Sequence, residues 1–320
     1  MKRRLARVLL AGSALLLVPL GMAVTGLAVL PALAQDATKP MTVVDKKPVI
    51  HPGEVKFGAY DPHGDFSTQK DLDTEGLFLP WEDVDLDTLR VADDYALKRG
   101  RKLLITIEPW SWNEDWRLTS DQLRAKVMAG EYDGNIKAIS KIVATLKSPV
   151  IIRWGQEMED KTGRFSWSNW PAKDYIAAYK RVADQFRKDR PDVQIMWSPK
   201  GEDGLDKYYP GDNYVDLVGL SVFGFQPFDQ RAFGGPRTFA EALQPGYDRV
   251  KQFQKPVWVA ELGYEGDAQY MQPWINTVTA RNPNFPSLQE VVYFNDREVQ
   301  AWPYGLGHPN WRVHKEMTEN

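Results

Sequence analysis

The sequence has no cysteine and only four histidines in 320 residues, so disulfides are excluded and imidazole-rich metal sites have little to draw on. The histidines show no H-E-x-x-H or similar spacing; they are His51, His63, His308 and His314. A net charge of only −3 and scattered basic residues give no sign of a nucleic-acid partner. Stability must therefore come from a hydrophobic core, which a chain of this length can build.

A long uncharged run occurs only at the N-terminus, over residues 8–33, after four basic residues within the first seven positions. Ala-Leu-Ala at 32–34 has the form of a cleavage site, so residues 1–34 are predicted to be a secretory signal peptide. We therefore expect a secreted or periplasmic protein. Because the run is about long enough to cross a bilayer, an uncleaved anchor through residues 8–33 stays open as the alternative.

The rest of the chain alternates short apolar runs with longer amphipathic stretches. The runs predicted to be strands are 55–60, 76–79, 102–107, 149–154, 193–197, 215–222, 256–260 and 290–294. Apolar residues at three and four spacing predict helices at 86–99, 135–146, 172–189, 239–254 and 268–280. Eight such units in about 260 residues predict an α/β fold, a single-domain (β/α)8 TIM barrel over 53–320. The polar segment 35–52, with three prolines, is expected to be a linker.

Two glutamates follow predicted strands and are the strongest functional candidates. Glu157 lies just past the strand at 149–154, and Glu261 comes directly after the strand at 256–260. Both are expected at the C-terminal ends of strands, where barrel active sites are built, and three units apart across the lumen. One carboxyl can protonate a glycosidic oxygen while the other attacks the anomeric carbon or activates water. A strand-end glutamate can also be structural, as expected for Glu159 and Glu265.

Other candidates share the same positions at strand ends or in loops. The strand-end set comprises Asp61, Trp81, Glu82, Glu108, Trp110, Gln156, Phe223, Asn295 and Asp296. Arg153 is expected to point into the barrel and to keep a neighbouring carboxylate, Glu261, ionised. Most aromatic residues serve the core, but six tryptophans lie in polar loops and are expected to stack on sugar rings. They are Trp110, Trp112, Trp116, Trp167, Trp170 and Trp302.

The segment Arg-Trp-Gly-Gln-Glu-Met at 153–158, followed by Trp167 and Trp170, resembles the Arg-x-x-His-Glu-Met-Asn-Gly…Trp segment of glycoside hydrolase family 26. This family of clan A retaining glycosidases is best known for β-mannanases. Further matches follow in the same order at 107–110, 215–220, 256–263 and 292–295. The resemblance implies a (β/α)8 barrel and retaining double displacement, with Glu157 as acid/base and Glu261 as nucleophile. It implies no metal and no organic cofactor.

Three departures from the family pattern indicate a divergent member. The histidine before the acid/base is Gln156, and the Asn-Gly after Met158 is Glu-Asp at 159–160. The tyrosine expected at the sixth strand is Phe223, which has no hydroxyl to donate to the nucleophile. The expected substrate-binding residues are therefore Gln156, Arg153, Trp110, Trp167, Trp170, Trp302, Glu108 and Phe223.

The leading hypothesis is an exported, monomeric, endo-acting retaining hydrolase of a β-linked polysaccharide, either β-mannan or β-1,3/1,4-glucan. β-1,3-Xylan and a bacterial exopolysaccharide remain open as substrates. The main alternative is a divergent barrel, weakly active or inactive, that binds or trims an exopolysaccharide. A metal-dependent hydrolase using Glu108, Glu157, Glu261 and Asp296 is disfavoured, because the strand ends offer no histidine.

Overall fold

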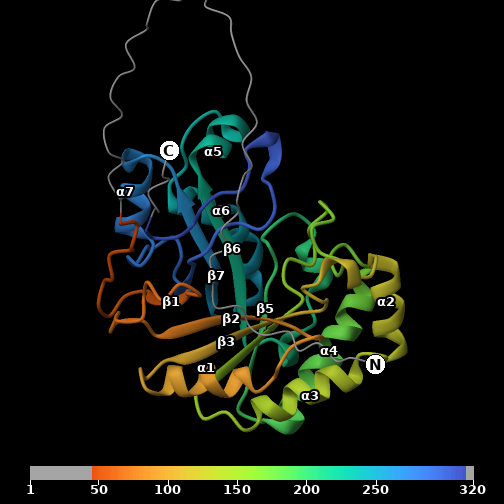
Figure 1. The fold of residues 1–320 in the computed structure, drawn as a ribbon. Coiled ribbons are helices and arrows are strands. Elements are labelled where there is room, and N and C mark those ends of the chain that lie inside the picture. The colour runs from red at the N-terminus through yellow and green to blue at the C-terminus, as the bar shows by residue number, and fades with distance from the viewer. Residues whose placement is uncertain (1–44, 315–320) are drawn as a thin grey trace, which may run out of the picture.

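The computed structural model describes residues 45–314, which form a closed barrel of eight parallel strands with helices around its outside (Figure 1). The strands are β1 (Lys56–Tyr60), β2 (Thr74–Pro80), β3 (Lys102–Glu108), β4 (Val150–Trp154), β5 (Gln194–Trp197), β6 (Leu217–Phe225), β7 (Val257–Glu265) and β8 (Leu288–Phe294). They pair in chain order, and β8 closes the barrel on β1 from Lys56↔Glu290 to Tyr60↔Phe294. The predicted (β/α)8 barrel is confirmed, with each of the eight strands at its expected place.

The outer layer contains the five predicted helices and two more. The helices are α1 (Thr88–Leu97), α2 (Ser120–Ala129), α3 (Asp133–Val143), α4 (Ala172–Asp189), α5 (Gln226–Phe233), α6 (Phe239–Val250) and α7 (Ala268–Thr277). The sequence pattern missed α2 and α5 because each buries little: Leu123 and Val127 in α2, and only Asp229 in α5. The start of α2 is fixed by a capping box between Thr119 and Gln122, and the helix has no strong apolar stripe.

The signal peptide or anchor expected over residues 1–34 lies outside the described residues. Part of the expected linker is described, and residues 45–52 lie against the barrel. Lys46 is buried and donates from Nζ to the carbonyl oxygens of Asn310 (2.8 Å) and Tyr264 (3.3 Å), while Asp45 forms an antiparallel bridge with His314. Within residues 45–314, no helix has the length and apolar character needed to cross a membrane.

The barrel lumen is filled in layers. Near the N-terminal ends of the strands, Lys102 Nζ lies 2.7 Å from Glu290 Oε2 and 4.6 Å from the ring centroid of Trp258. Above that pair lies an apolar layer made of Leu104, Ile151, Met196, Leu217, Trp258, Ala260 and Val292. Next to this layer lie the polar side chains of Thr106, Arg153, Ser198 and Glu261, which hydrogen-bond to one another above a packed floor.

A β-bulge in β7 sets which side chains face the lumen. The pairing with β6 passes from Leu220↔Val259 to Ser221↔Glu261, so Ala260 is an extra residue in β7. The pairing with β8 shifts over the same stretch. A bulge changes the alternation of side chains, and here it lets Glu261 join Ala260 on the lumen side while Leu262 packs in the outer core.

The position of Glu261 differs from the expectation drawn from the sequence. We expected Glu261 to end its strand, but β7 continues to Glu265, and β6 continues past residue 222 to Phe225. Glu261 is therefore held in mid-strand, between two hydrogen-bonded neighbours. A strand position fixes a side chain more tightly than a loop position does, which suits a group that must be aimed at one atom.

Gly219 provides a test of lumen packing. A Cβ there would lie 2.6 Å from Met196 Sδ and 2.9 Å from both Ala260 Cβ and Ser198 Oγ. We expect Gly219→Ala to lower the free energy of unfolding by about 1–3 kcal/mol through overpacking. Equilibrium urea unfolding with an unchanged m-value would measure this loss.

The matched control is Gly134→Ala at the start of α3, where a Cβ would meet nothing within 4 Å. This change should be neutral or raise stability by up to about 1 kcal/mol, because alanine is the better helix former. Equal stability of both variants would contradict the packing argument.

Candidate active site

Glu261 and Arg153 form a buried ion pair at the centre of the lumen. Arg153 Nη1 lies 2.6 Å from Glu261 Oε1, and the guanidinium is fully buried. Its Nε donates to Ser198 Oγ (2.8 Å) and Nη1 also reaches Thr106 Oγ1 (3.4 Å). Within the part of the chain that the structure describes, Nη2 has no partner. The structure thus brings together the arginine and the glutamate that the sequence suggested would meet.

Two opposing influences act on the Glu261 carboxyl. Burial raises the pKa of Glu261 and so does the negative charge of Glu157, while the Arg153 guanidinium lowers it; the net pKa is about 7. The Arg153 guanidinium is the largest influence that offsets the cost of burying this carboxylate, and Arg164 adds a smaller one. The ionised form of Glu261 at neutral pH therefore depends on Arg153.

Glu157 follows β4 in a strained turn. Its φ of +56° lies in the left-handed region, which costs a residue with a Cβ about 1–2 kcal/mol. The turn is held because the Glu157 amide donates to the Ser198 carbonyl (2.8 Å) and the Glu157 carbonyl accepts from the Asp160 amide (3.0 Å). Residues 45–314 supply no hydrogen bond to its carboxyl, which lines the cavity described below. The turn, although strained, holds this carboxyl at the cavity wall, where a substrate can reach it.

Two cations accompany Glu157 and were not among the residues predicted from the sequence. Lys200 Nζ pairs with Asp160 (2.8 Å) and Glu202 (2.7 Å). Arg164 Nη2 pairs with Glu298 (2.7 Å). Although burial lowers the pKa of each cation, the charge of Glu157 raises it. Lys200 could have been predicted from the sequence, because it follows the end of β5 by three residues. It was missed because the set of strand-end candidates included no residue after the fifth strand.

Glu108 orients Gln156, the residue before Glu157. Its Oε1 accepts from Gln156 Nε2 (3.2 Å), and its Oε2 accepts from the indole nitrogens of Trp110 (3.0 Å) and Trp112 (2.9 Å). An ionised carboxylate only accepts hydrogen bonds, so the amide nitrogen of Gln156 must face it. The side-chain oxygen of Gln156, Oε1, then has no partner among the described residues and is an available acceptor.

The predicted tryptophans fall into two groups. Trp167 and Trp170 are buried, and their indole nitrogens donate to the carbonyl oxygens of Gln156 (2.7 Å) and Ser166 (2.8 Å). The expectation that these two rings stack on sugar is wrong, because they are part of the protein wall, and Trp110 is nearly as buried. Trp112 and Trp116 are 50% and 58% exposed, and Trp302 is half-buried.

The remaining strand-end candidates are structural. Asp61 accepts from Asn295 Nδ2 (2.6 Å) and from the Phe66 amide (2.7 Å), and Asp296 pairs with His63 (3.0 Å). Trp81 stacks on Tyr132 with centroids 4.3 Å apart, and burial raises the pKa of Glu82. Glu159 accepts from the backbone amides of residues 201 and 202, and Glu265 accepts from the Asn310 amide, so both are structural as expected.

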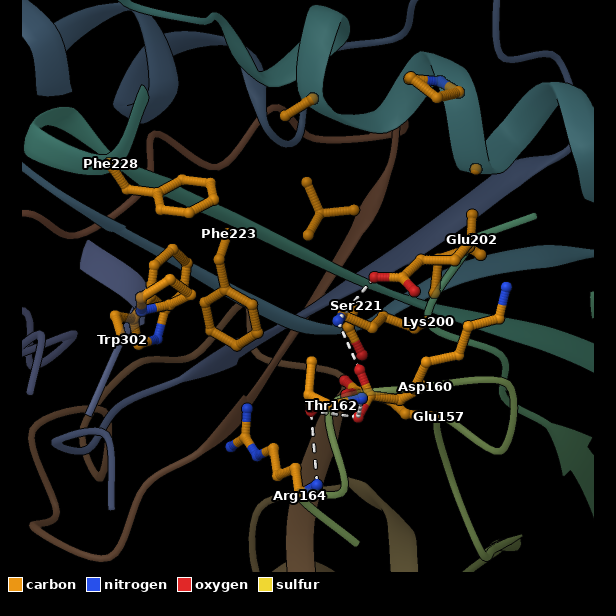
Figure 2. A pocket seen from close by; sticks show the side chains of 18 of the residues that line it. Glu157, Asp160, Thr162, Arg164, Lys200, Glu202, Ser221, Phe223, Phe228 and Trp302 are labelled. Atoms are coloured by element: carbon orange, nitrogen blue, oxygen red, sulfur yellow. Dashed lines mark hydrogen bonds and ion pairs between the residues drawn. The ribbon is translucent and has the colours of Figure 1, made fainter. Parts of the chain in front are cut away.

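A cavity of about 960 Å³ opens beside Glu157 (Figure 2). Its lining comes from the loops after β4 and β5, the end of β6, helices α5 and α6, and the loop after β8. Phe223, Phe228 and Trp302 gather on one side of it, and Glu157 and Lys200 lie on the other (Figure 2). Among the described residues, no group of three or more His, Asp or Glu side chains is arranged to hold a metal ion.

The parallel barrel, with one carboxyl paired to a buried arginine and a second lining a large cavity at the strand ends, defines a protein of the (β/α)8 glycosidase class. Residues 108–296, more than half of the chain, match the model of glycosyl hydrolase family 26. The chain therefore belongs to that family. The resemblance carried by the sequence motifs is confirmed, and with it the enzyme class, a glycoside hydrolase.

The relatives are distant. Endoglucanase H of Acetivibrio thermocellus is 22% identical over 250 residues, covering 72% of this chain and 26% of that protein. A mannan endo-1,4-beta-mannosidase of Bacillus subtilis is 25% identical over 225 residues, covering 62% of this chain and 56% of that protein. The chain thus spans about a quarter of the first relative and just over half of the second.

Solved structures agree on the fold. The GH26 beta-mannanase of Bacteroides ovatus has a TM-score of 0.55 at 19% identity, over 75% of this chain and 80% of that one. A modular endo-beta-1,4-mannanase of Cellulomonas fimi has a TM-score of 0.58 at 16% identity, over 76% and 65%. At such identities the likeness supports the barrel and not a substrate.

Arg153→Met tests the electrostatic role of the ion pair. Removing the guanidinium should raise the pKa of Glu261 further, so activity should fall away at a higher pH on the acidic side. We expect the acidic limb of kcat/KM to move up by about a unit or more, with a rate loss of roughly 10² to 10³. The full pH profile of kcat/KM would measure both effects.

Arg190→Met is the matched control, because Arg190 is also buried but donates only to backbone carbonyls below the site and to Asp192. It should lower stability and leave the limb in place. Tyr264 cannot substitute for Arg153, since its hydroxyl donates to the Lys46 carbonyl on the outer side of β7 (2.6 Å). An unmoved limb in Arg153→Met would mean that another group holds Glu261 ionised.

Proposed function

We propose that this protein is an exported, endo-acting, retaining β-glycoside hydrolase. The observation that carries the proposal is the different setting of the two carboxyls. Glu261 is bound to a buried guanidinium, which favours a charged nucleophile, whereas Glu157 lines the cavity without a hydrogen bond from the described residues. One charged and one proton-exchanging carboxyl are what a double displacement requires.

The reaction divides into two steps. The Glu261 carboxylate attacks the anomeric carbon, the glycosidic bond breaks, and the Glu157 carboxyl gives its proton to the departing oxygen. Glu157, now a carboxylate, takes a proton from water as the water oxygen attacks the same carbon and releases Glu261. The cations Arg164 and Lys200 lie close enough to interact with the charge that Glu157 carries in the second step.

For the substrate we propose a β-linked polysaccharide, either β-mannan or β-1,3/1,4-glucan. The named relatives support this class, since they are called mannan endo-1,4-beta-mannosidase, endoglucanase and beta-1,3-xylanase. Endo action is supported by rings in two loops at the strand ends, the exposed Trp112 and Trp116 after β3 and the half-buried Trp302 after β8. Export rests on the basic start, the uncharged run and the Ala-Leu-Ala site at 32–34.

The first test is Glu261→Ala with a panel of soluble β-mannan, β-1,3/1,4-glucan, β-1,3-xylan and exopolysaccharide. The unsubstituted protein should release reducing ends from at least one of them, and Glu261→Ala should release none while keeping its fold by circular dichroism. Azide should restore part of the activity on an aryl glycoside and give a product of inverted configuration. Saccharide binding without hydrolysis by the unsubstituted protein would favour the non-catalytic alternative.

The second test is Glu157→Gln, compared on two leaving groups. Protonation by Glu157 matters most when the leaving oxygen is basic, so natural saccharides should lose far more activity than aryl glycosides with acidic phenols. Initial rates under conditions limited by the first step would measure the ratio of losses. Equal losses on both substrates would count against Glu157 as the acid.

A further inference from the structure

Five aromatic rings form a continuous surface at one side of the cavity; we call Phe223, Phe228, Phe233, Trp302 and Tyr304 the α5 aromatic cluster. Phe228 lies at the centre, with ring centroids 5.0 Å from Trp302, 5.9 Å from Tyr304 and 6.0 Å from Phe233. Trp302 also contacts Phe223 at 6.4 Å. Phe233 and Tyr304 are each 58% exposed. Phe223, Phe228 and Trp302 are half-buried, and a contiguous, partly exposed surface of rings of this kind usually marks a binding surface.

The cluster packs on a buried, hydrogen-bonded base, although the Phe233 and Tyr304 rings are exposed. Asp229 of α5 is fully buried and accepts from Arg237 Nε (3.0 Å), Arg237 Nη2 (2.8 Å) and the Tyr270 hydroxyl (2.7 Å). Arg237 in turn lies over the Phe233 ring at 4.0 Å from its centroid. A platform that is already ordered loses little entropy on binding a ligand.

The cluster is continuous with the active site. Phe223, Phe228, Phe233 and Trp302 line the same cavity as Glu157 (Figure 2). A β-linked glycan with one sugar at Glu157 can extend into this cavity and meet the rings. Pyranose rings carry hydroxyls on their edges and C–H groups on their faces, so they match flat exposed rings better than a wholly apolar ligand would.

We propose that the α5 aromatic cluster is a glycan-binding subsite that stacks on pyranose units of the substrate away from the bond being cleaved. The proposal rests on the proposed function. It adds to that function a binding site formed by the rings of α5 together with Phe223, Trp302 and Tyr304. It implies that short substrates, which do not reach α5, are cleaved without its help. Longer chains gain affinity from it.

The test compares long and short substrates in Phe233→Ala, Phe228→Ala and the double variant. The substrates are β-1,4-mannohexaose and a mixed-linkage β-glucan hexasaccharide, each paired with its aryl disaccharide. We expect kcat/KM for the hexasaccharide to fall roughly ten- to hundred-fold in the double variant, the scale of losing one or two buried ring contacts. Activity on the aryl disaccharide should stay within about two-fold. Phe228→Tyr should keep most of the hexasaccharide activity, because the ring remains.

Tyr95→Ala is the matched control, since Tyr95 is a half-buried ring on α1 that also lies under an arginine, Arg99, at 3.6 Å. It should change neither substrate. Unchanged hexasaccharide kinetics in the double variant would overturn the subsite while leaving the proposed function intact. Equal losses on both substrates would also overturn it, by showing that the cluster only supports the fold.

A binding measurement keeps the subsite testable if no hydrolysis is found. Calorimetric titration of each hexasaccharide into Glu261→Ala should show binding that weakens roughly ten-fold or more when Phe228→Ala and Phe233→Ala are added. Binding that the two changes leave unaltered, or the absence of any binding, would overturn the subsite. A dimer in light scattering that the two changes dissociate would show that the cluster covers a second copy of the chain instead.

Discussion

The ion pair between Arg153 and Glu261 is the constraint around which the upper half of the lumen is arranged. Moving a guanidinium and a carboxylate out of water costs several kcal/mol for each ion, and only close pairing with further hydrogen bonds offsets that cost. Thr106 on β3 and Ser198, directly after β5, supply those hydrogen bonds. The bulge at Ala260 supplies the geometry, because it turns Glu261 toward the arginine without breaking the ladder.

This arrangement explains how two glutamates in one lumen can have different chemistry. Glu261 is buried and contacts one fixed cation at 2.6 Å, which is the largest of the charges that act on it. Glu157 faces the cavity and is influenced by Arg164 and Lys200, which are themselves paired with other carboxylates. Two titratable groups whose surroundings differ in this way are suited to different roles in one reaction.

Much of the fold could be predicted because the rhythm of apolar runs reflects strands that are buried on both faces. The ends of β6 and β7 could not, since Gly224 in β6 and Glu261 and Gly263 in β7 interrupt the apolar pattern while backbone pairing continues. The contact between Arg153 and Glu261 could be predicted from the places of the two residues on their strands. The bulge that permits this contact could not, because nothing in the neighbouring sequence indicates it. Loop composition misled for Trp167 and Trp170: their polar neighbours suggested exposure, but tertiary packing turned both rings inward.

Phe223 connects the electrostatics of the site with its aromatic surface. Where the family resemblance implies a tyrosine hydroxyl beside the nucleophile, this chain has a ring that packs on Trp311 at 4.9 Å and meets Trp302. Gly263 makes the room, since a Cβ there would lie 2.9 Å from the Phe223 ring. Losing the hydroxyl removes one donor that would lower the pKa of Glu261, which increases the dependence on Arg153. The Phe223 ring also joins the aromatic surface of the cavity through Trp302, so one residue both withholds a donor from the site and adds apolar surface for a glycan.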